Sequence, residues 1–527
     1  MQGPRPLWFF ILLVLTFIVS CIVVNAYQSW KLALLVNTII ATTVALSIYS
    51  SIGAVGYGSS SLSDGFDVAA KFILRDTSFI NAWVNEPYFI FFPATSTLYA
   101  LLSMISGVNV STSFLIIGVM QTVLLTIIIT LIVKFSSSDP TIACLALPFV
   151  LSNPRLGVWA PHPSLLSLLF AALFVYFIFL RFNPAKQGHL DKSFVLLLIL
   201  LDLSSVVNHT AGSITIALFI GGLVVFEILQ RKLKRLRILN LCHAGRIFIL
   251  FLVIALAYWA STYAFYSIVP RVLITLGALW NFLHTGQPIY VYTPKQTLRS
   301  PIEAYCWAVP VALVAAFTLL WFKGLFKKAE FSSSKDLYIN MIVVAIGVLS
   351  VPTVLFSFLV KLATTAASSE RYLSAPVYLL MLIASPLIVA KMSNRKITSI
   401  LMISSLVVLL FIGATSYTWS IDSVIGKTVY EDELIGNKLG SMIDNNTCVY
   451  TANGYVIIHL VLNNMAVKGG NPSVFNQMSQ GKTTPKSDPA SEVTIYICDP
   501  KIMETLSDQN VNVVYLSTRY VAFTPQE

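Results

Sequence analysis

Charged residues are scarce in this chain of 527 residues. Asp, Glu, Lys and Arg together make up 11% of it, whereas an ordinary soluble domain carries about 25%. Hydrophobic residues account for 56%, and the mean hydropathy is +0.79. This composition excludes a soluble globular protein and predicts a polytopic α-helical protein of the cell membrane.

Long apolar segments account for the composition. A helix needs about 20 apolar residues to cross the roughly 30 Å hydrocarbon core of a bilayer. About twelve segments cross or nearly cross it by this criterion, at residues 7–26, 33–50, 111–135, 140–152, 163–181, 193–207, 211–229, 247–268, 303–323, 337–360, 373–391 and 397–416. Two of them are short, so we expect about 11–13 transmembrane helices within a membrane domain of residues 1–416.

Residues 417–527 differ from the rest because they are polar and rich in turn residues. Strand-like segments (CVYTA, EVTIYIC, VNVVYLS, YVAFT) alternate there with helix-like ones (TVYEDELIGNKLGSMID, PKIMETLSDQ). The pattern predicts a small soluble α/β domain. This tail lacks a nucleophile elbow, a phosphate loop and a zinc-ligand spacing, which favours a binding or scaffolding role over catalysis.

Lysine and arginine clusters orient the spans. The clusters at Arg231–Arg246, Lys323–Lys335 and Lys391–Lys396 are predicted to be cytoplasmic. Counting spans outward from them places the C-terminal domain and the 269–302 loop outside the cell membrane. The net formal charge of +11 then reflects topology and attraction to anionic lipid, so no nucleic-acid partner is expected.

The first outer loop, residues 51–110, holds an unusual group of polar residues. Up to residue 87 it carries Asp64, Asp67, Asp76 and Glu86 against Lys71 and Arg75. This acidic balance favours the outer side, because a cytoplasmic loop is normally basic. Pro93–Ser106 is then an amphipathic helix in the outer interface. If Ile90–Ser106 instead spans the membrane, the 51–87 loop is cytoplasmic and all later assignments stay the same.

Several segments together resemble the GT-C superfamily of polytopic glycosyltransferases, especially its archaeal members. The first is the acidic outer loop followed by a helix that opens at an aromatic-Pro step and closes at Gly107. The others are SNPRLGVWAPHP (152–163), VVNHT (206–210) and SERYL (369–373). The resemblance implies a sugar donor linked to a polyprenyl phosphate, an outer-loop carboxylate, and cationic groups around the lipid phosphate. The acceptor is not indicated.

The resemblance makes Asp67 the first candidate for the catalytic base and Asp64 the second. A carboxylate can take the proton of an acceptor that is otherwise a poor nucleophile. Asp67 also precedes the helix-like segment VAAKFILR, from whose N-terminal end it can project. The structural alternative is that the two aspartates are a turn residue and an N-cap.

Basic residues at predicted outer boundaries are candidates for binding substrate. Arg371, Arg155 and Arg271 suit a lipid phosphate because guanidinium grips phosphate oxygens in two places, although each can equally extend to lipid headgroups. His162 and His209 are candidates for positioning sugar or phosphate, or are satisfied helix-end histidines.

Asp202 is an ionisable residue inside a predicted span, seven residues before His209 and on nearly the same helix face. Such a residue suggests substrate binding, with interhelical hydrogen bonding as the alternative.

Motifs that are absent from the sequence limit what can be inferred about metal use and about the reaction. The first loop has no Asp-x-Asp, Asp-Glu or Glu-Asp pair, so no cofactor is assigned and the use of a divalent metal stays open. The Trp-Trp-Asp signature of oligosaccharyltransferase catalytic subunits is missing, which argues against transfer of a whole oligosaccharide to asparagine. A membrane transporter and a non-catalytic cell-surface binding or assembly protein are the alternative functions.

Two modifications are expected in the outer domain. Cys448 and Cys498 fall on predicted strands in an oxidising compartment, where they can form a disulfide. Glycosylation sequons begin at Asn109, Asn208 and Asn445, and only Asn445 is clearly distant from the membrane.

Overall fold

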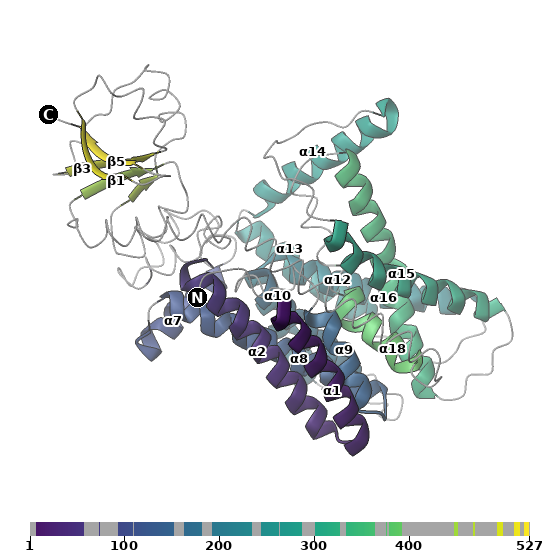
Figure 1. Cartoon of the computed structure of the whole chain (residues 1–527). Helices are drawn as coiled ribbons and strands as arrows, with labels where there is room; N and C mark the ends of the chain where they lie inside the picture. The colour runs from purple at the N-terminus through teal and green to yellow at the C-terminus, as the bar shows by residue number, and fades with distance from the viewer. Residues whose placement is uncertain are drawn as a thin grey trace.

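The structure is a computed structural model of the whole chain. It describes residues 7–56, 73, 93–108, 110–151, 163–181, 192–233, 244–262, 264–286, 301–326, 334–363, 376 and 379–392, and the strand residues 447–451, 467–469, 493–498, 511–516 and 521–525. Figure 1 shows a bundle of helices and, apart from it, a small sheet.

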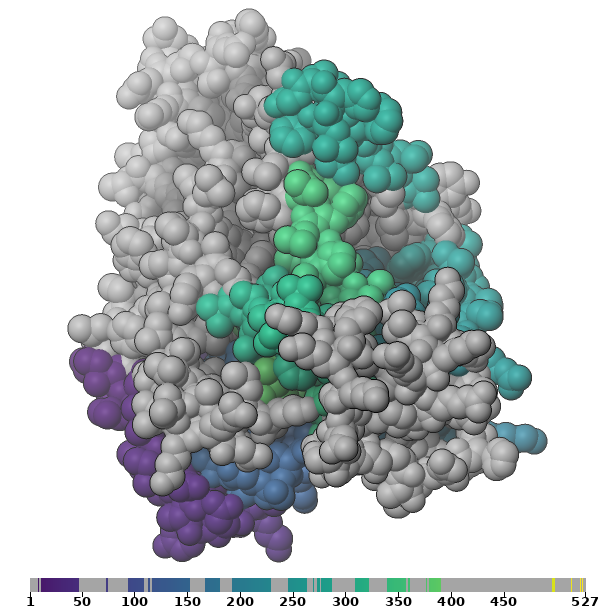
Figure 2. Space-filling view, turned by 90° about the vertical axis from the view of Figure 1, so that its right-hand side faces the viewer, coloured from purple at the N-terminus to yellow at the C-terminus, as the bar shows by residue number. Residues whose placement is uncertain are grey.

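The first two helices form an antiparallel pair at the edge of the bundle. Helices α1 (Leu7–Tyr27) and α2 (Trp30–Gly56) are joined by two residues, and α2 packs on α8 (Val110–Ser136) and α9 (Thr141–Leu151). Figure 2 shows this purple N-terminal part at the surface. Polar groups reinforce the packing, because Asn37 Nδ2 donates to Thr130 Oγ1 at 3.1 Å and to Ala143 O at 2.9 Å.

Six helices form the central part of the bundle. They are α10 (Pro163–Arg181), α11 (Lys192–Asn208), α12 (Thr210–Leu233), α13 (Ala244–Ser261), α15 (Pro301–Phe326) and α16 (Ser334–Ala363). Helix α10 packs against α8, α11 and α12, α12 packs against α13 and α16, and α15 packs against α16. A π-helix, η1 (Leu380–Ala384), continues into α18 (Ser385–Met392). The bounds of α10, α11, α12, α15 and α16 match the predicted spans closely, including the short span at 193–207, whereas the span at 397–416 lies outside the described residues.

Helix α7 (Pro93–Ser106) has the bounds predicted for the interfacial helix, and it packs on α8 and α11. Its buried face includes the hydroxyl residues Thr95, Ser96, Tyr99 and Ser103. Its exposed face is apolar, with Leu98, Leu101, Met104 and Ile105 between 37% and 83% exposed. Polar groups inside and aliphatic groups outside are the arrangement expected of a helix that faces lipid.

The predicted span 247–268 and loop 269–302 differ from the structure. Helix α13 ends at Ser261, and a further helix, α14 (Ala264–Thr285), occupies much of the predicted loop. Leu273, Leu276, Trp280 and Leu283 lie three or four residues apart on α14 and are 48–67% exposed. This stripe agrees with the helix character of VLITLGALWNFL (272–283) in the sequence, although that segment was assigned to an outer loop and the helix is longer than the segment.

The apolar helices are those of a membrane protein. Among the described residues, three helical segments are long and apolar enough to cross a membrane: Ile116–Ser136, Thr210–Ile228 and Ile339–Phe356. Shorter apolar helices accompany them, such as Thr141–Leu151 in α9 and Leu166–Leu180 in α10. Exposed leucines on α11, at positions 196, 200 and 203, also give that helix an apolar outer stripe.

The C-terminal strands form one mixed sheet in the order β2-β1-β3-β5-β4. Four of them were expected from the sequence: β1 (Thr447–Thr451), β3 (Val493–Cys498), β4 (Val511–Leu516) and β5 (Val521–Pro525). The fifth strand, β2 (Val467–Gly469), was missed because only three residues of it pair. The predicted helices of this domain and the boundary at 416/417 lie outside the described residues, so the α/β classification stays a prediction.

The register of the sheet bears on the predicted disulfide. Strands β1 and β3 are parallel neighbours, and Cys448 lies opposite Thr494. Cys498 is four residues further along β3, which corresponds to about 13 Å along a strand. A disulfide requires Cα atoms about 4.4–6.8 Å apart. The predicted Cys448–Cys498 disulfide therefore does not fit this register.

Candidate functional site

A break between two helices forms the centre of the candidate site. Helix α11 ends at Asn208 and α12 begins at Thr210, with His209 between them. The backbone N–H of His209 donates to Ser205 O at 3.2 Å, and its ring Nδ1 accepts from the N–H of Ala211 at 3.0 Å. The ring of His209 thus accepts a hydrogen bond from an N–H in the first turn of α12 that has no acceptor within the helix. This is the alternative predicted for His209, a histidine whose hydrogen bond is made at the end of a helix.

Serine hydroxyls join α10 to this break. Ser167 Oγ lies 2.8 Å from both Ser205 O and His209 O, and it accepts from the N–H of Gly212 at 3.0 Å. Because the Ser167 hydroxyl has one proton, it can donate a hydrogen bond to only one of these two carbonyl oxygens at a time. Ser205 Oγ donates back to Ser167 O at 3.1 Å. The helices approach so closely that a Cβ on Gly212 would lie 2.5 Å from Ser167 O.

Helix α7 is attached to the same break by one side-chain hydrogen bond. Thr95 Oγ1 donates to Asn208 Oδ1 at 2.9 Å, and both residues are at most 3% exposed. Asn208 Nδ2 donates to Ser204 O at 2.7 Å. The amide of Asn208 is therefore engaged in the interior, which makes it unsuitable as a glycan acceptor.

The Thr95–Asn208 bond should be measurable as a coupling between α7 and α11. We expect the effects of Thr95→Val and Asn208→Leu on the free energy of unfolding to be non-additive by about 0.6 kcal/mol, and at most about 1.7 kcal/mol, as for other bonds between membrane helices. Unfolding of both single variants and the double variant in one detergent provides the measurement. Thr97→Val is the matched control, since Thr97 bonds Pro93 O of its own helix. If the effects of Thr95→Val and Asn208→Leu on the free energy of unfolding add, the hydrogen bond between Thr95 and Asn208 is contradicted.

Asp202 is the most unusual residue of the site. It is 2% exposed, and neither carboxylate oxygen has a hydrogen-bond partner among the described residues. The described charged residues on α11 and on its packing partners α7, α10, α12 and α13 lie in the turns at the opposite helix ends: Lys192, Arg181, Glu227, Arg231, Lys232 and Arg246. The interhelical hydrogen bond expected as the alternative role of Asp202 is thus not seen in the described part of the chain.

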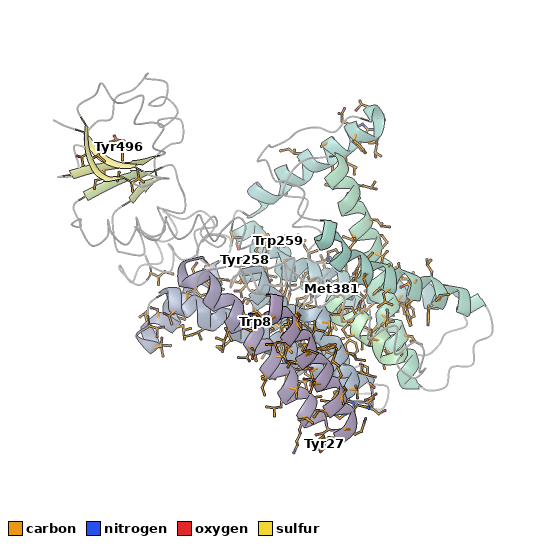
Figure 3. All side chains as sticks on the ribbon, in the orientation of Figure 1. Trp8, Tyr27, Tyr258, Trp259, Met381 and Tyr496 are labelled. Atoms are coloured by element: carbon orange, nitrogen blue, oxygen red, sulfur yellow. The ribbon has the colours of Figure 1, made fainter. Side chains whose placement is uncertain are left out.

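Three further buried polar groups near these helix ends have no hydrogen-bond partner among the described residues. They are Ser96 Oγ on α7, Ser213 Oγ on α12 and the Nε1–H of Trp259 on α13. Figure 3 places Trp259 and Tyr27 at opposite ends of the bundle, and Tyr27 marks the end predicted to be cytoplasmic. Buried polar groups without partners are rare in proteins, so several together indicate a place that a ligand or water completes.

The structure tests few of the other predicted site residues. Asp64, Asp67, Arg155, His162, Arg371 and Asn445 lie outside the described residues. Arg271 lies in α14, and the orientation of its side chain is not described. In the part of the chain that is described, no three His, Cys, Asp or Glu side chains group as metal ligands.

Sequence reasoning missed the residues that build the break around His209. Thr95, Ser167, Ser205 and Gly212 are small or hydroxyl-bearing residues within apolar segments. Such residues let membrane helices approach closely and bond to one another. The signal available was the occurrence of such residues in four predicted helices, three of which are consecutive in the sequence.

Comparison with known proteins gives a distant structural similarity only. No family model and no curated protein sequence matches the chain. ArnT from Cupriavidus metallidurans is similar in its apo state, at 12% identity and a TM-score of 0.46, over 88% of this chain and 93% of that chain. The same protein bound to undecaprenyl phosphate gives 12% identity and a TM-score of 0.48, over 94% and 98%.

An oligosaccharyltransferase from Archaeoglobus fulgidus, tethered to an acceptor peptide containing an NVT sequon, is also similar. It is 10% identical with a TM-score of 0.44, over 94% of this chain and 74% of that chain. Because all three TM-scores are below 0.5, the similarity assigns no activity to this chain.

Proposed function

We propose that this protein is a GT-C-like membrane glycosyltransferase that moves a sugar from a polyprenyl-phosphate donor to an acceptor at the extracytoplasmic face. One observation carries the proposal: of the buried polar groups without partners among the described residues, which occur in several parts of the bundle, four lie near the joined ends of α7, α11, α12 and α13, and Asp202 is the one ionisable group among them. Polar and ionisable groups inside a membrane domain are costly and are kept for function. The type of reaction, transfer of a sugar from a lipid-linked donor, is inferred from the resemblance of the sequence to GT-C glycosyltransferases.

The reaction requires a base and a cationic group. Asp67, or Asp64 as the second choice, takes the proton of the acceptor as the acceptor attacks the anomeric carbon. The bond from that carbon to the phosphate oxygen breaks, and the electron pair leaves with the polyprenyl phosphate. Arg371, Arg155 and Arg271, with His162 at the same rim, are proposed to stabilise the charge of the leaving phosphate.

A membrane transporter is the second candidate function, and Asp202 is the observation that favours it. Ionisable residues inside spans commonly mark substrate or ion pathways. In that case a soluble sugar or ion crosses the membrane and no lipid-linked donor is consumed. The two functions therefore differ in the fate of the donor.

Turnover of the donor tests the proposal. The full-length protein in lipid nanodiscs is incubated with polyprenyl phosphates that carry different labelled sugars, together with a membrane extract as the source of acceptor. We expect one donor to be consumed, with release of free polyprenyl phosphate and transfer of the label. If no donor is consumed while proteoliposomes accumulate a labelled solute, the transporter replaces the transferase.

A further inference from the structure

We propose that Asp202, Ser96, Ser213 and Trp259 form a subsite that binds the hydroxyl groups of a neutral sugar on the lipid-linked donor. The inference rests on the proposed function and adds the part of the donor that this site recognises. It also narrows the role expected for Asp202 from general substrate binding to sugar binding.

The four groups lie within the terminal turns of helices whose ends are packed together. Asp202 lies six residues before the end of α11, about 9 Å along the helix. Ser213 lies three residues after the start of α12, and Trp259 lies two residues before the end of α13. Helix α13 packs on both α11 and α12, and the Thr95–Asn208 bond holds the first turn of α7, with Ser96, at the end of α11.

The donor and acceptor character of the four groups matches a sugar. A carboxylate accepts up to about four hydrogen bonds, a Trp Nε1–H only donates, and a Ser hydroxyl does both. A sugar ring carries several hydroxyls that donate and accept in different directions, so it can satisfy all four groups. Leaving them without partners costs about 1–3 kcal/mol for a neutral group and more for a charged one.

The same groups discriminate against the phosphate of the donor. A buried phosphate needs cationic groups or several hydrogen-bond donors to offset its charge. No lysine or arginine in the described turns near Asp202 supplies such a cation. The subsite therefore fits the sugar, and the phosphate requires basic residues elsewhere.

Comparison of two lipids tests the subsite without requiring turnover. Binding of a polyprenyl phosphate linked to a neutral hexose and of the same polyprenyl phosphate without sugar is measured by native mass spectrometry for each variant. We expect Asp202→Asn and Trp259→Phe to weaken binding of the sugar-linked lipid about tenfold and to leave binding of the sugar-free lipid unchanged. Asp139→Asn is the matched control, because Asp139 lies in the turn between α8 and α9, where it accepts from the N–H of Thr141 at 2.8 Å. Monodisperse elution and an unchanged unfolding temperature verify folding.

The outcomes separate this inference from the proposed function. Equal losses for both lipids, no loss for either, or wild-type protein that binds the two lipids equally would overturn the subsite and leave water as the partner of these groups. If the sugar-linked lipid binds selectively through Asp202 but no donor is turned over, the transferase fails and the subsite stands. If the donor is turned over and Asp202→Asn binds it normally, only the subsite fails.

Discussion

Replacing Gly212 with alanine should lower the free energy of unfolding by about 1–3 kcal/mol, the usual cost of overpacking a close contact. An added Cβ would lie 2.5 Å from Ser167 O and would also contact the hydroxyls of Ser167 and Ser205. The serine hydroxyls can rotate, whereas the carbonyl of Ser167 belongs to the backbone of α10. Helix α10 must therefore move away from α12, and the hydrogen bond from Gly212 N to Ser167 Oγ lengthens. Thermal or denaturant unfolding in detergent measures the loss.

A second glycine provides the control for Gly212. Gly245 is also near the N-terminal end of its helix, and a Cβ there meets nothing within 4 Å. Gly245→Ala should be neutral or stabilising by up to about 1 kcal/mol, since alanine favours the helix. Equal effects at Gly212 and Gly245 would show that α10 and α12 are not in close contact at this point.

Replacing Asp67 with asparagine should reduce sugar transfer about 100- to 10,000-fold, the usual contribution of a general base. The amide of asparagine has nearly the shape of the carboxylate but cannot take the acceptor proton. Donor binding should change little, because the role assigned to Asp67 concerns the acceptor. Initial rates of label transfer at saturating donor measure the effect.

The same substitution separates catalysis from helix capping. Asparagine caps a helix about as well as aspartate, so a purely structural Asp67 would tolerate the change in both stability and activity. A large loss of transfer with unchanged unfolding temperature therefore identifies a chemical role. Asp64→Asn is measured alongside, and if both variants transfer sugar at the wild-type rate, the base lies outside the first loop.

Much of the helical fold could be read from the sequence because apolar segments of sufficient length have few alternatives to a helix in a membrane. The bounds of α7 were predicted correctly since Pro93 opens the helix and Gly107, with a φ of 71°, closes it. The four longer strands were recognisable by their β-branched and aromatic residues. The helix character of the apolar segment in α14 was recognisable, but the segment was assigned to an outer loop and the bounds of the helix were not predicted.

The candidate site could be predicted only in part. Asp202 and His209 were identified because an acid in a span and a histidine at its end are conspicuous in apolar sequence. Thr95 and Asn208 are separated by 113 positions, and no local pattern pairs them. The lack of a partner for Asp202 likewise depends on which faces of α7, α10, α12 and α13 turn toward it.

The sequence by itself determined the membrane class, most helix bounds and the acidic character of the first loop, because these follow from composition and local periodicity. Only the tertiary structure decided that serines and a glycine bring α10 against α11 and α12, and that α7 bonds to the end of α11. It also decided that Cys448 lies opposite Thr494, four residues from Cys498. Side-chain pairing depends on how helices rotate and strands register, and many distant contacts set these together.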